Sequence, residues 1–147
     1  MSPNAYGIVG SQANAVAPGK VPLSSMTPTL VFEGPTFESP IRLIVGSPGG
    51  SRIPTTVVQV IMHYLDQGAD VERAIALGRV HHQHLPDLVS LEPFALEAAT
   101  RAQLTRQGYV LEDDSYWSNA TAIAVDPTTG VRTGAADFRG FGRAMAE

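Results

Sequence analysis

The sequence predicts an α+β domain with largely antiparallel strands and helices packed on them. Two predicted strands come first along the chain, helices follow, and more strands come last. This order lacks the strict alternation of strands and helices that produces a doubly wound parallel sheet. A turn at residues 126–130 (DPTTG) joins the last two strands as a hairpin, the short connection that antiparallel strands use. With 147 residues, 44% of them hydrophobic, the chain is long enough for one domain with its own core.

The first fifth of the chain predicts a long loop, after which a pair of strands is expected. Residues 1–27 are rich in Gly, Pro, Ser, Asn and Ala and show no hydrophobic periodicity. Loops of this length are uncommon in compact domains and tend to be functional lids or binding loops. Residues 29–33 predict a short strand that ends at a Gly-Pro turn. The β-branched run at residues 41–45 predicts a second, buried strand.

Three helices are predicted in the middle of the chain, at residues 51–66, 71–77 and 95–107. In the first, Ser51 is placed as the N-cap, and apolar residues recur at helical spacing toward Gly68, which ends the helix. Asp70 begins the second helix, and Gly108 ends the third. The predicted strands in the second half lie at residues 88–91, 109–112, 120–126 and 131–135. The rest of residues 78–93 is predicted to be irregular.

Composition narrows the classes of function. The net charge of −4 and ten scattered basic residues do not form the basic footprint of a nucleic-acid-binding protein. Without cysteine the chain has no disulfide, no thiolate metal ligand and no thiol nucleophile. No run approaches the roughly 18 apolar residues of a membrane span. The N-terminal residues are not typical of a signal peptide, so the leader of an exported parent protein would lie upstream.

Two motifs could bind an anion. Residues 22–26 (PLSSM) place the hydroxyls of Ser24 and Ser25 side by side, and residues 46–52 (GSPGGSR) form a glycine turn between a strand and a helix. Backbone N–H groups at such a turn can face negative charge. The turn has neither a phosphate-loop ending nor a dinucleotide fingerprint. An oxyanion hole, a carboxylate site and an ordinary turn all remain open, and from these residues alone the ordinary turn is favoured. Serine pairs in loops usually cap helices or bond to their own backbone, and only the less common interpretation has them donate to a carboxylate.

The sequence offers no obvious nucleophile and no metal site. Three imidazoles at residues 81–84 (HHQH) cannot all point one way, and no HExxH pattern exists, so a packed and hydrogen-bonded segment is favoured. No Gly-x-Ser-x-Gly elbow is present, and His81 and His82 have no obvious serine partner. Ser2 could become N-terminal after removal of Met1, but it precedes Pro3 in a loop. We therefore expect anion-binding groups without an attacking group.

Taken together, the motifs resemble the γ-glutamyltranspeptidase family. The resemblance covers nearly the whole chain in order, at residues 3–10 (PNAYGIVG), 13–20 (ANAVAPGK), 22–29 (PLSSMTPT), 46–53 (GSPGGSRI), 81–87 (HHQHLPD) and 134–137 (GAAD). It implies an N-terminal-nucleophile (Ntn) hydrolase with an αββα sandwich, made as a precursor that cleaves itself into large and small subunits. The N-terminal threonine of the small subunit then transfers γ-glutamyl groups of glutathione and similar compounds to water, an amino acid or a peptide, without metal or cofactor.

The resemblance also assigns roles to individual residues. Ser24 and Ser25 match the serine pair that holds the substrate's α-carboxylate. Gly49 and Gly50 match the glycines whose N–H groups form the oxyanion hole, and Tyr6 with the loop after it looks like the lid over the pocket. Residues 1–147 then correspond to the C-terminal portion of a small subunit, with the lid and substrate loop at 1–27 and the α+β core at 28–147.

Several expectations follow from this correspondence. The threonine segment and the large subunit would be partners encoded outside the chain, so the chain by itself is expected to be inactive. The family suggests a periplasmic or secreted location. His84 replaces a tryptophan and Phe138 a proline that are usual in the family, which affects local packing.

Two alternatives stay open. A related Ntn acylase, of the cephalosporin or glutaryl acylase type, would share the fold, although a serine pair suits an amino-acid carboxylate better. A non-catalytic remnant would bind γ-glutamyl compounds without turning them over.

Overall fold

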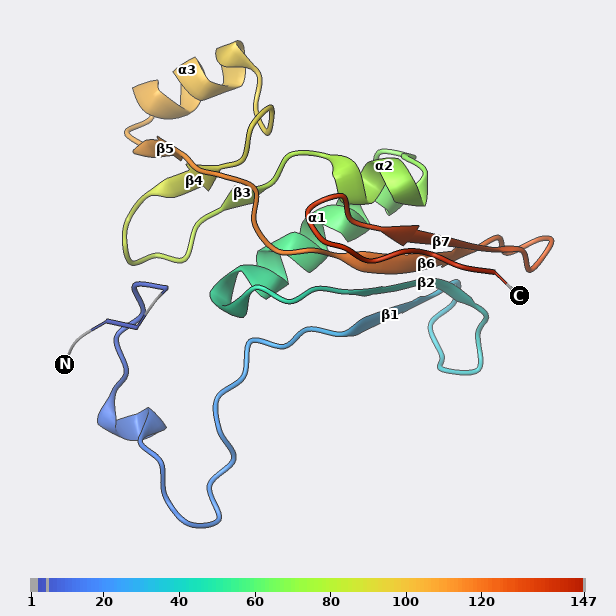
Figure 1. The fold of residues 1–147 in the computed structure, drawn as a ribbon, viewed down its shortest axis with the longest axis horizontal. Helices are drawn as coiled ribbons and strands as arrows, with labels where there is room; N and C mark the ends of the chain where they lie inside the picture. Colours follow the sequence, from blue (N-terminus) through green and yellow to red (C-terminus); the bar gives the residue numbers. More distant parts are fainter. Residues whose placement is uncertain (1–2, 5, 147) are drawn as a thin grey trace.

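The computed structural model describes residues 3–4 and 6–146, which form two sheets and three α-helices (Figure 1). The larger sheet has four strands in the order β1-β2-β6-β7, and all its neighbouring strands are antiparallel. Its strands are β1 (Thr29–Phe32), β2 (Ile41–Gly46), β6 (Thr121–Val125) and β7 (Arg132–Ala136). The predicted hairpin between the last two strands is present as β6 and β7.

Two helices cover one face of the larger sheet. Helices α1 (Ile53–Leu65) and α2 (Val71–Ala76) lie on the same side of the strands in Figure 1. Apolar side chains between the two layers form the buried core, namely Leu43, Val45, Ile53, Val57, Val60, Val71, Ala74, Ile75, Ala120, Ala122, Ala124 and Ala135. The small alanines of β6, Ala122 and Ala124, leave room for the larger side chains of the helices, so the two layers can pack closely.

The opposite face of the larger sheet is apolar and open. Leu30, Ile44 and Ile123 are cross-strand neighbours on β1, β2 and β6, and they are 52%, 37% and 40% exposed. A hollow of about 760 Å³ lies along this face, bordered by residues 143–145 near the C-terminus. None of the helices in the described residues is long and apolar enough to cross a membrane.

The smaller sheet stands beside the helix layer. It consists of β3 (Val80–His81), β4 (Val89–Leu91) and β5 (Leu111–Asp113), in that order. Strand β4 pairs with β3 antiparallel and with β5 parallel. Helix α3 (Ala98–Arg106) makes the connection between β4 and β5 that a parallel pair requires, and none of its residues is fully buried.

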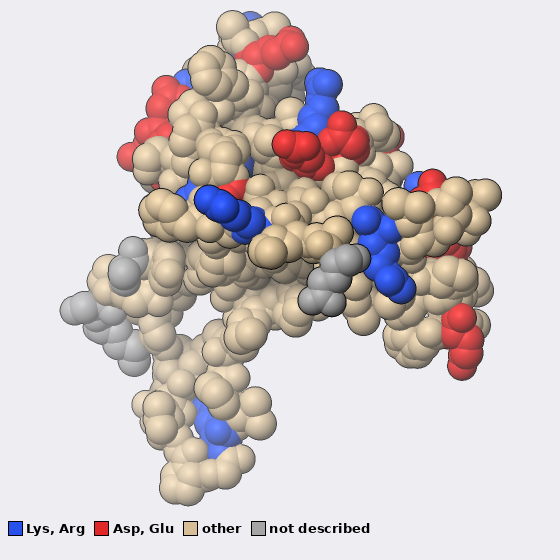
Figure 2. Space-filling view, turned by 45° about the vertical axis from the view of Figure 1, so that its right-hand side comes forward, with Lys and Arg blue, Asp and Glu red and all other residues tan. Residues whose placement is uncertain are grey.

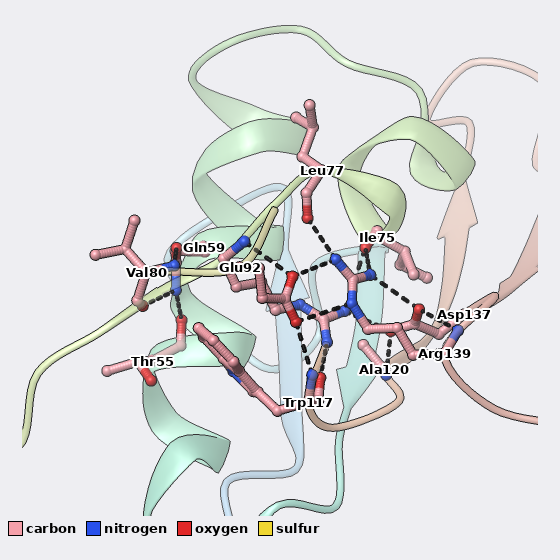
Figure 3. Close-up of polar contacts among 11 residues, drawn as sticks. Thr55, Gln59, Ile75, Leu77, Val80, Glu92, Trp117, Ala120, Asp137 and Arg139 are labelled. Atoms are coloured by element: carbon pink, nitrogen blue, oxygen red, sulfur yellow. Dashed lines mark hydrogen bonds and ion pairs between the residues drawn. The ribbon is translucent and has the colours of Figure 1, made fainter. Parts of the chain in front are cut away.

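A cluster of buried charges ties the two sheets together (Figure 3). Arg79 precedes β3 and pairs with Asp137, which follows β7. Arg139 pairs with the same Asp137 and with Glu92, which follows β4. These side chains are 1% exposed or less. The two carboxylates also accept the backbone N–H groups of Trp117 (2.9 Å) and Ala120 (2.9 Å), so the charges are both paired and hydrogen-bonded.

The N-terminal segment is the loop that composition predicts. Apart from a single 3₁₀ turn, η1 (Gln12–Asn14), the described residues before β1 form no regular element. Figures 1 and 2 show this segment projecting from the body of the molecule. The side chain of Lys20 folds back onto the carbonyls of Ala13 and Ala15, which closes the projecting loop on itself.

The α+β fold with largely antiparallel strands and packed helices is confirmed, and three local predictions are wrong. Ser51 does not cap α1, because it lies inside a 3₁₀ turn, η2 (Gly50–Arg52), that directly precedes the helix, and Arg52 is the N-cap residue. Strand β3 was not expected in a segment predicted to be irregular. Helix α3 begins at Ala98 and not at residue 95, because Glu97 is still extended. Strands β4 and β5 form a parallel pair in a second sheet, a pairing that local sequence does not encode.

Candidate active site

The glycine turn (residues 46–52) contains two positions, Gly49 and Gly50, whose backbone only glycine adopts without strain. Gly49 has φ +136° and Gly50 has φ +58°, both in the left-handed region. A Cβ atom at Gly49 would overlap the Oγ of Ser118, and one at Gly50 would overlap the ring of Tyr6. Both glycines are therefore required by conformation and by the closeness of neighbouring side chains.

The carbonyls of the turn point back toward α1. The carbonyl of Gly49 accepts the N–H of Arg52 (3.1 Å), and that of Gly50 accepts the N–H of Ile53 and the Oγ of Ser25 (2.7 Å). In a trans peptide the N–H points opposite to the preceding carbonyl, so the Gly50 N–H points away from the helix. Within the described residues, the N–H groups of Gly49 and Gly50 donate to no acceptor. They are available to an anionic oxygen.

The serine pair lies against this turn, and its two hydroxyls differ. Ser25 is partly buried and donates its proton to the Gly50 carbonyl, which joins two motifs that are 25 residues apart. Ser24 is exposed, and its Oγ accepts the N–H of Met26 (3.1 Å). Because a hydroxyl has one proton, that of Ser25 is used inside the protein, whereas that of Ser24 can be donated to a ligand.

Tyr6 is held over the turn by Gln83, a residue that the motifs alone left without a role. The Gln83 Nε2 donates to the carbonyls of Tyr6 (2.5 Å) and Leu85 (3.1 Å), and its Oε1 accepts the Ser51 hydroxyl (2.7 Å). The one sequence signal that could have drawn attention to Gln83 is its position between two histidines in the HHQH string. The tertiary structure thus brings Tyr6, Ser25 and the two glycines together, while Ser24 lies next to them on the exposed side.

His81 is a buried histidine inside the same network. Its Nδ1 lies 2.8 Å from the Thr55 Oγ1 on α1, and its Nε2 lies 3.0 Å from the Gln83 Oε1. Because an amide oxygen only accepts, we assign the proton to Nε2 and let Nδ1 accept the threonine hydroxyl, whose single proton also faces the Arg52 carbonyl (3.1 Å). Burial lowers the pKa of His81, and the nearby Arg52 charge acts in the same direction. The imidazole is therefore neutral at pH 7. The hydroxyl that it contacts belongs to Thr55, so His81 is not the base partner of a serine.

The other two histidines of the HHQH string, His82 and His84, do not take part in the hydrogen-bond network around Gln83. His82 pairs with Asp87 at 3.1 Å, and His84 has a positive φ that turns the chain away. Throughout residues 3–4 and 6–146, no three His, Asp or Glu side chains gather in a way that could hold a metal ion.

A cavity of about 560 Å³ opens beside the turn, lined by Tyr6, Gly49, Ser51, Arg52, His81, Gln83, Pro86, Leu88, Ser90, Glu112, Asp113, Asp114, Trp117 and Ser118. The Arg52 guanidinium lies 4.5 Å above the buried Trp117 ring and donates to Asp114 at 2.7 Å. Burial alone would raise the pKa of Asp114, but the hydrogen bonds from Arg52 and Ser115, together with the Arg52 charge, outweigh burial and lower the pKa.

The cavity holds hydroxyls but no nucleophile with a base beside it. The Ser51 hydroxyl donates to an amide, and the buried Oγ of Ser118 has no partner among the residues that the structure describes. An activated serine needs an imidazole or another base within hydrogen-bonding distance. Among the described residues the site thus offers the unused N–H groups of Gly49 and Gly50 and the exposed Ser24 hydroxyl, without a hydroxyl in the cavity placed beside a base.

Comparison with known protein families shows to which family this chain belongs. A sequence model for gamma-glutamyltranspeptidase matches residues 1–147, which is the whole chain. The chain belongs to the γ-glutamyltranspeptidase family. The resemblance stated from the motifs is confirmed, and so are the Ntn-hydrolase fold class and the association with glutathione hydrolases.

Individual relatives of this γ-glutamyltranspeptidase chain agree. It is 44% identical over 126 residues to the glutathione hydrolase proenzyme of Pseudomonas aeruginosa, covering 84% of this chain and 22% of that protein. A mutant γ-glutamyltranspeptidase of Helicobacter pylori superposes with a TM-score of 0.86 at 42% identity, over 95% of this chain and 74% of that chain. A cephalosporin acylase of Bacillus halodurans superposes with a TM-score of 0.59 at 26% identity, over 65% of this chain and 18% of that chain. The chain thus spans about a fifth of the length of the Pseudomonas relative.

Proposed function

We propose that this chain supplies the carboxylate-binding and oxyanion-stabilising groups of an active site that transfers or hydrolyses γ-glutamyl groups of glutathione and γ-glutamyl amides. The contact between Ser25 and the Gly50 carbonyl carries the proposal, because it joins the serine pair to the glycine turn. A γ-glutamyl group has its α-carboxylate a short distance from the acyl carbon that is attacked. A site for it needs both kinds of donor close together.

The two donor sets have separate tasks. The N–H groups of Gly49 and Gly50 would stabilise the oxyanion that forms when the γ-carbonyl is attacked, a role in which one lost donor costs about 10²–10³ in rate. The Ser24 hydroxyl would donate to the α-carboxylate, and Ser25 would hold the turn in place through the Gly50 carbonyl. Tyr6, which lies against Gly50, would cover the bound substrate as a lid.

The attacking group would come from another segment of the protein. The family's chemistry uses an N-terminal threonine whose own amine acts as the base, which requires neither metal nor organic cofactor. We expect the rest of the small subunit and the large subunit to be the partners that complete the site. The chain by itself is then expected to bind γ-glutamyl compounds at most.

The acylase alternative predicts a different substrate preference. The cephalosporin acylase shares the fold over a portion of the chain at lower identity. If the Ser24 hydroxyl binds an α-carboxylate, the full-length protein should prefer γ-glutamyl-p-nitroanilide to the 4-aminobutyryl anilide, which lacks only that carboxylate. Equal turnover of both anilides would favour an acylase. Failure of the full-length protein to turn over either anilide would favour the remnant.

Separate substitutions of the two serines test the site most directly. In the full-length protein, Ser24→Ala should raise KM for γ-glutamyl-p-nitroanilide about tenfold or more, as expected for a lost hydrogen bond to a charged group. Ser25→Ala should lower kcat as well, because the Gly50 carbonyl loses its donor. Steady-state kinetics measure both changes. The 4-aminobutyryl anilide is the substrate control for Ser24→Ala, and an unchanged KM for the γ-glutamyl substrate would contradict the carboxylate assignment.

A further inference from the structure

Gln83 lies where the lid segment, the glycine turn and β3 meet. We propose that Gln83 is a positioning residue that couples the Tyr6 turn (Asn4 and residues 6–8) to the glycine turn, so that the oxyanion donors keep their geometry only while the Tyr6 turn is in place. The coupling itself stands on contacts in the structure, and its effect on catalysis rests on the proposed function.

The Gln83 amide uses all of its hydrogen-bonding capacity. Its oxygen accepts from the Ser51 Oγ (2.7 Å) and the His81 Nε2 (3.0 Å), and its nitrogen donates to the carbonyls of Tyr6 (2.5 Å) and Leu85 (3.1 Å). A primary amide has two donors and accepts two hydrogen bonds, so no capacity is left over. Rotation of the side chain would break contacts to several segments at once.

The Tyr6 turn is a compact unit that Gln83 holds at one point. The Asn4 Oδ1 accepts the N–H groups of Tyr6 (2.9 Å) and Ile8 (3.1 Å), and the Gly7 N–H donates to the Asn4 carbonyl (2.9 Å). A Cβ atom at Gly7 would press on Pro86, which shows that this turn rests against the segment that carries Gln83. The bond from Gln83 to the Tyr6 carbonyl therefore fixes where the tyrosine ring lies on Gly50.

On the other side, Gln83 reaches the glycine turn through its neighbour. Ser51 follows Gly50 directly and donates to the Gln83 oxygen. Neutral His81 orients that oxygen, and the Thr55 hydroxyl on α1 anchors the imidazole in turn. These hydrogen bonds connect Ser51, just before α1, with Thr55 in its first turn, so the network spans the start of the helix.

The chemistry of the contacts requires an amide at this position. A carboxylate has no proton to donate, so Glu in place of Gln83 would set its oxygen against the carbonyl oxygens of Tyr6 and Leu85. Leu has a similar volume and makes neither kind of bond. Both changes should release the Tyr6 turn from the glycine turn, and Gln83→Glu should do so more strongly through repulsion.

Hydrogen–deuterium exchange on the full-length protein tests the coupling. In Gln83→Leu and Gln83→Glu, the amides of Gly7 and Ile8, and that of Arg52 in the glycine turn, should exchange faster by about tenfold, the effect of losing roughly one hydrogen bond. In the same variants, kcat for γ-glutamyl-p-nitroanilide should fall about tenfold while KM changes less, because the loss concerns oxyanion geometry.

Gln59→Leu is the matched control. The Gln59 side chain makes three hydrogen bonds, to the Thr55 carbonyl and to both backbone groups of Val80, and it touches neither Tyr6 nor Ser51. Its loss should lower the melting temperature without faster exchange at Gly7. A variant of Gln83 that matches Gln59→Leu in all readouts would have only a structural role, which would overturn the proposal.

The remaining outcomes are also decisive. Faster exchange at Gly7 and at Arg52 together supports the coupling, and faster exchange at only one of them overturns it. Should the full-length protein turn over no γ-glutamyl anilide, the proposed function fails while the exchange result still decides the coupling. If the protein is active and Gln83→Leu keeps the wild-type kcat, the catalytic role proposed for Gln83 is wrong.

Discussion

His81 shows how a single buried residue makes this site sensitive to pH. Burial, reinforced by the Arg52 charge, lowers the pKa of His81 below its ordinary value of 6.5. In the unfolded chain the same imidazole takes up a proton as the pH falls through 6.5, whereas in the folded protein it does so only at a lower pH. The unfolded state then binds more protons, so stability decreases as the pH falls through this range.

We expect the free energy of unfolding of the full-length protein to fall as the pH decreases from neutral through 6.5, in part because of His81. His81→Gln should give a flatter dependence over this range, since glutamine takes up no proton, even if it is less stable at neutral pH. Urea unfolding at several pH values measures the difference. An identical slope in the wild type and the variant would show that His81 is protonated in the folded state as readily as in the unfolded one.

The charge cluster is the feature that relates the two sheets to each other and to the site. Glu92 and Arg79 bind the backbone of Trp117 (Figure 3). The side chain of the next residue, Ser118, fills the space that a Cβ atom at Gly49 would need. Burying charges is costly, and the cost is offset here by full pairing and by hydrogen bonds to backbone groups. The cluster thus holds the wall of the cavity against the glycine turn, although none of its members lines the cavity.

Asp137→Asn should destabilise the protein by about 3–5 kcal/mol, the typical cost of removing one partner from a buried ion pair. Two arginines share Asp137, so the change leaves uncompensated positive charge inside the protein. Denaturant unfolding measures the loss. Asp113→Asn is the control, because Asp113 forms an exposed bidentate pair with Arg101 and should matter far less. Equal effects of the two changes would contradict the importance of burial.

The open apolar face of the larger sheet characterises the chain as a whole. One face of the sheet is covered by α1 and α2, and the other presents the row Leu30, Ile44 and Ile123. A face of this kind is typical of a sheet that packs on a second sheet about 10 Å away. The chain spans about a fifth of the Pseudomonas relative, so we propose that the rest of the protein supplies that second layer.

The chain produced by itself is therefore expected to self-associate and to bind a hydrophobic dye. Ile44→Thr with Ile123→Thr should reduce both effects, because the two side chains are cross-strand partners on the open face. In the full-length protein the same pair should instead lower the melting temperature. Light scattering and dye fluorescence measure the first effect, and calorimetry the second. Reduced stability without reduced dye binding would indicate that the face is not the exposed apolar surface.

Local sequence predicted the elements well where one face of an element is consistently apolar. Residues 41–45 and 120–126 are predicted as strands and form β2 and β6, and Asp70 caps α2 as expected, with its side chain accepting the Arg73 N–H. Prediction failed for β3, since a two-residue strand has no periodicity. No pairing was predicted for β4 and β5, because pairing between distant strands is not locally encoded.

The sequence by itself determined the family and the α+β class, and it singled out Tyr6, the serine pair and the two glycines as candidate site residues. It could do so because short motifs and hydrophobic periodicity are local properties of a chain. Only the tertiary structure decided that Ser25 binds the Gly50 carbonyl while Ser24 keeps its proton. Only there does Gln83 join the Tyr6 turn to Ser51. Such contacts span up to 77 residues of sequence, and their geometry exists only once packing has brought those segments together.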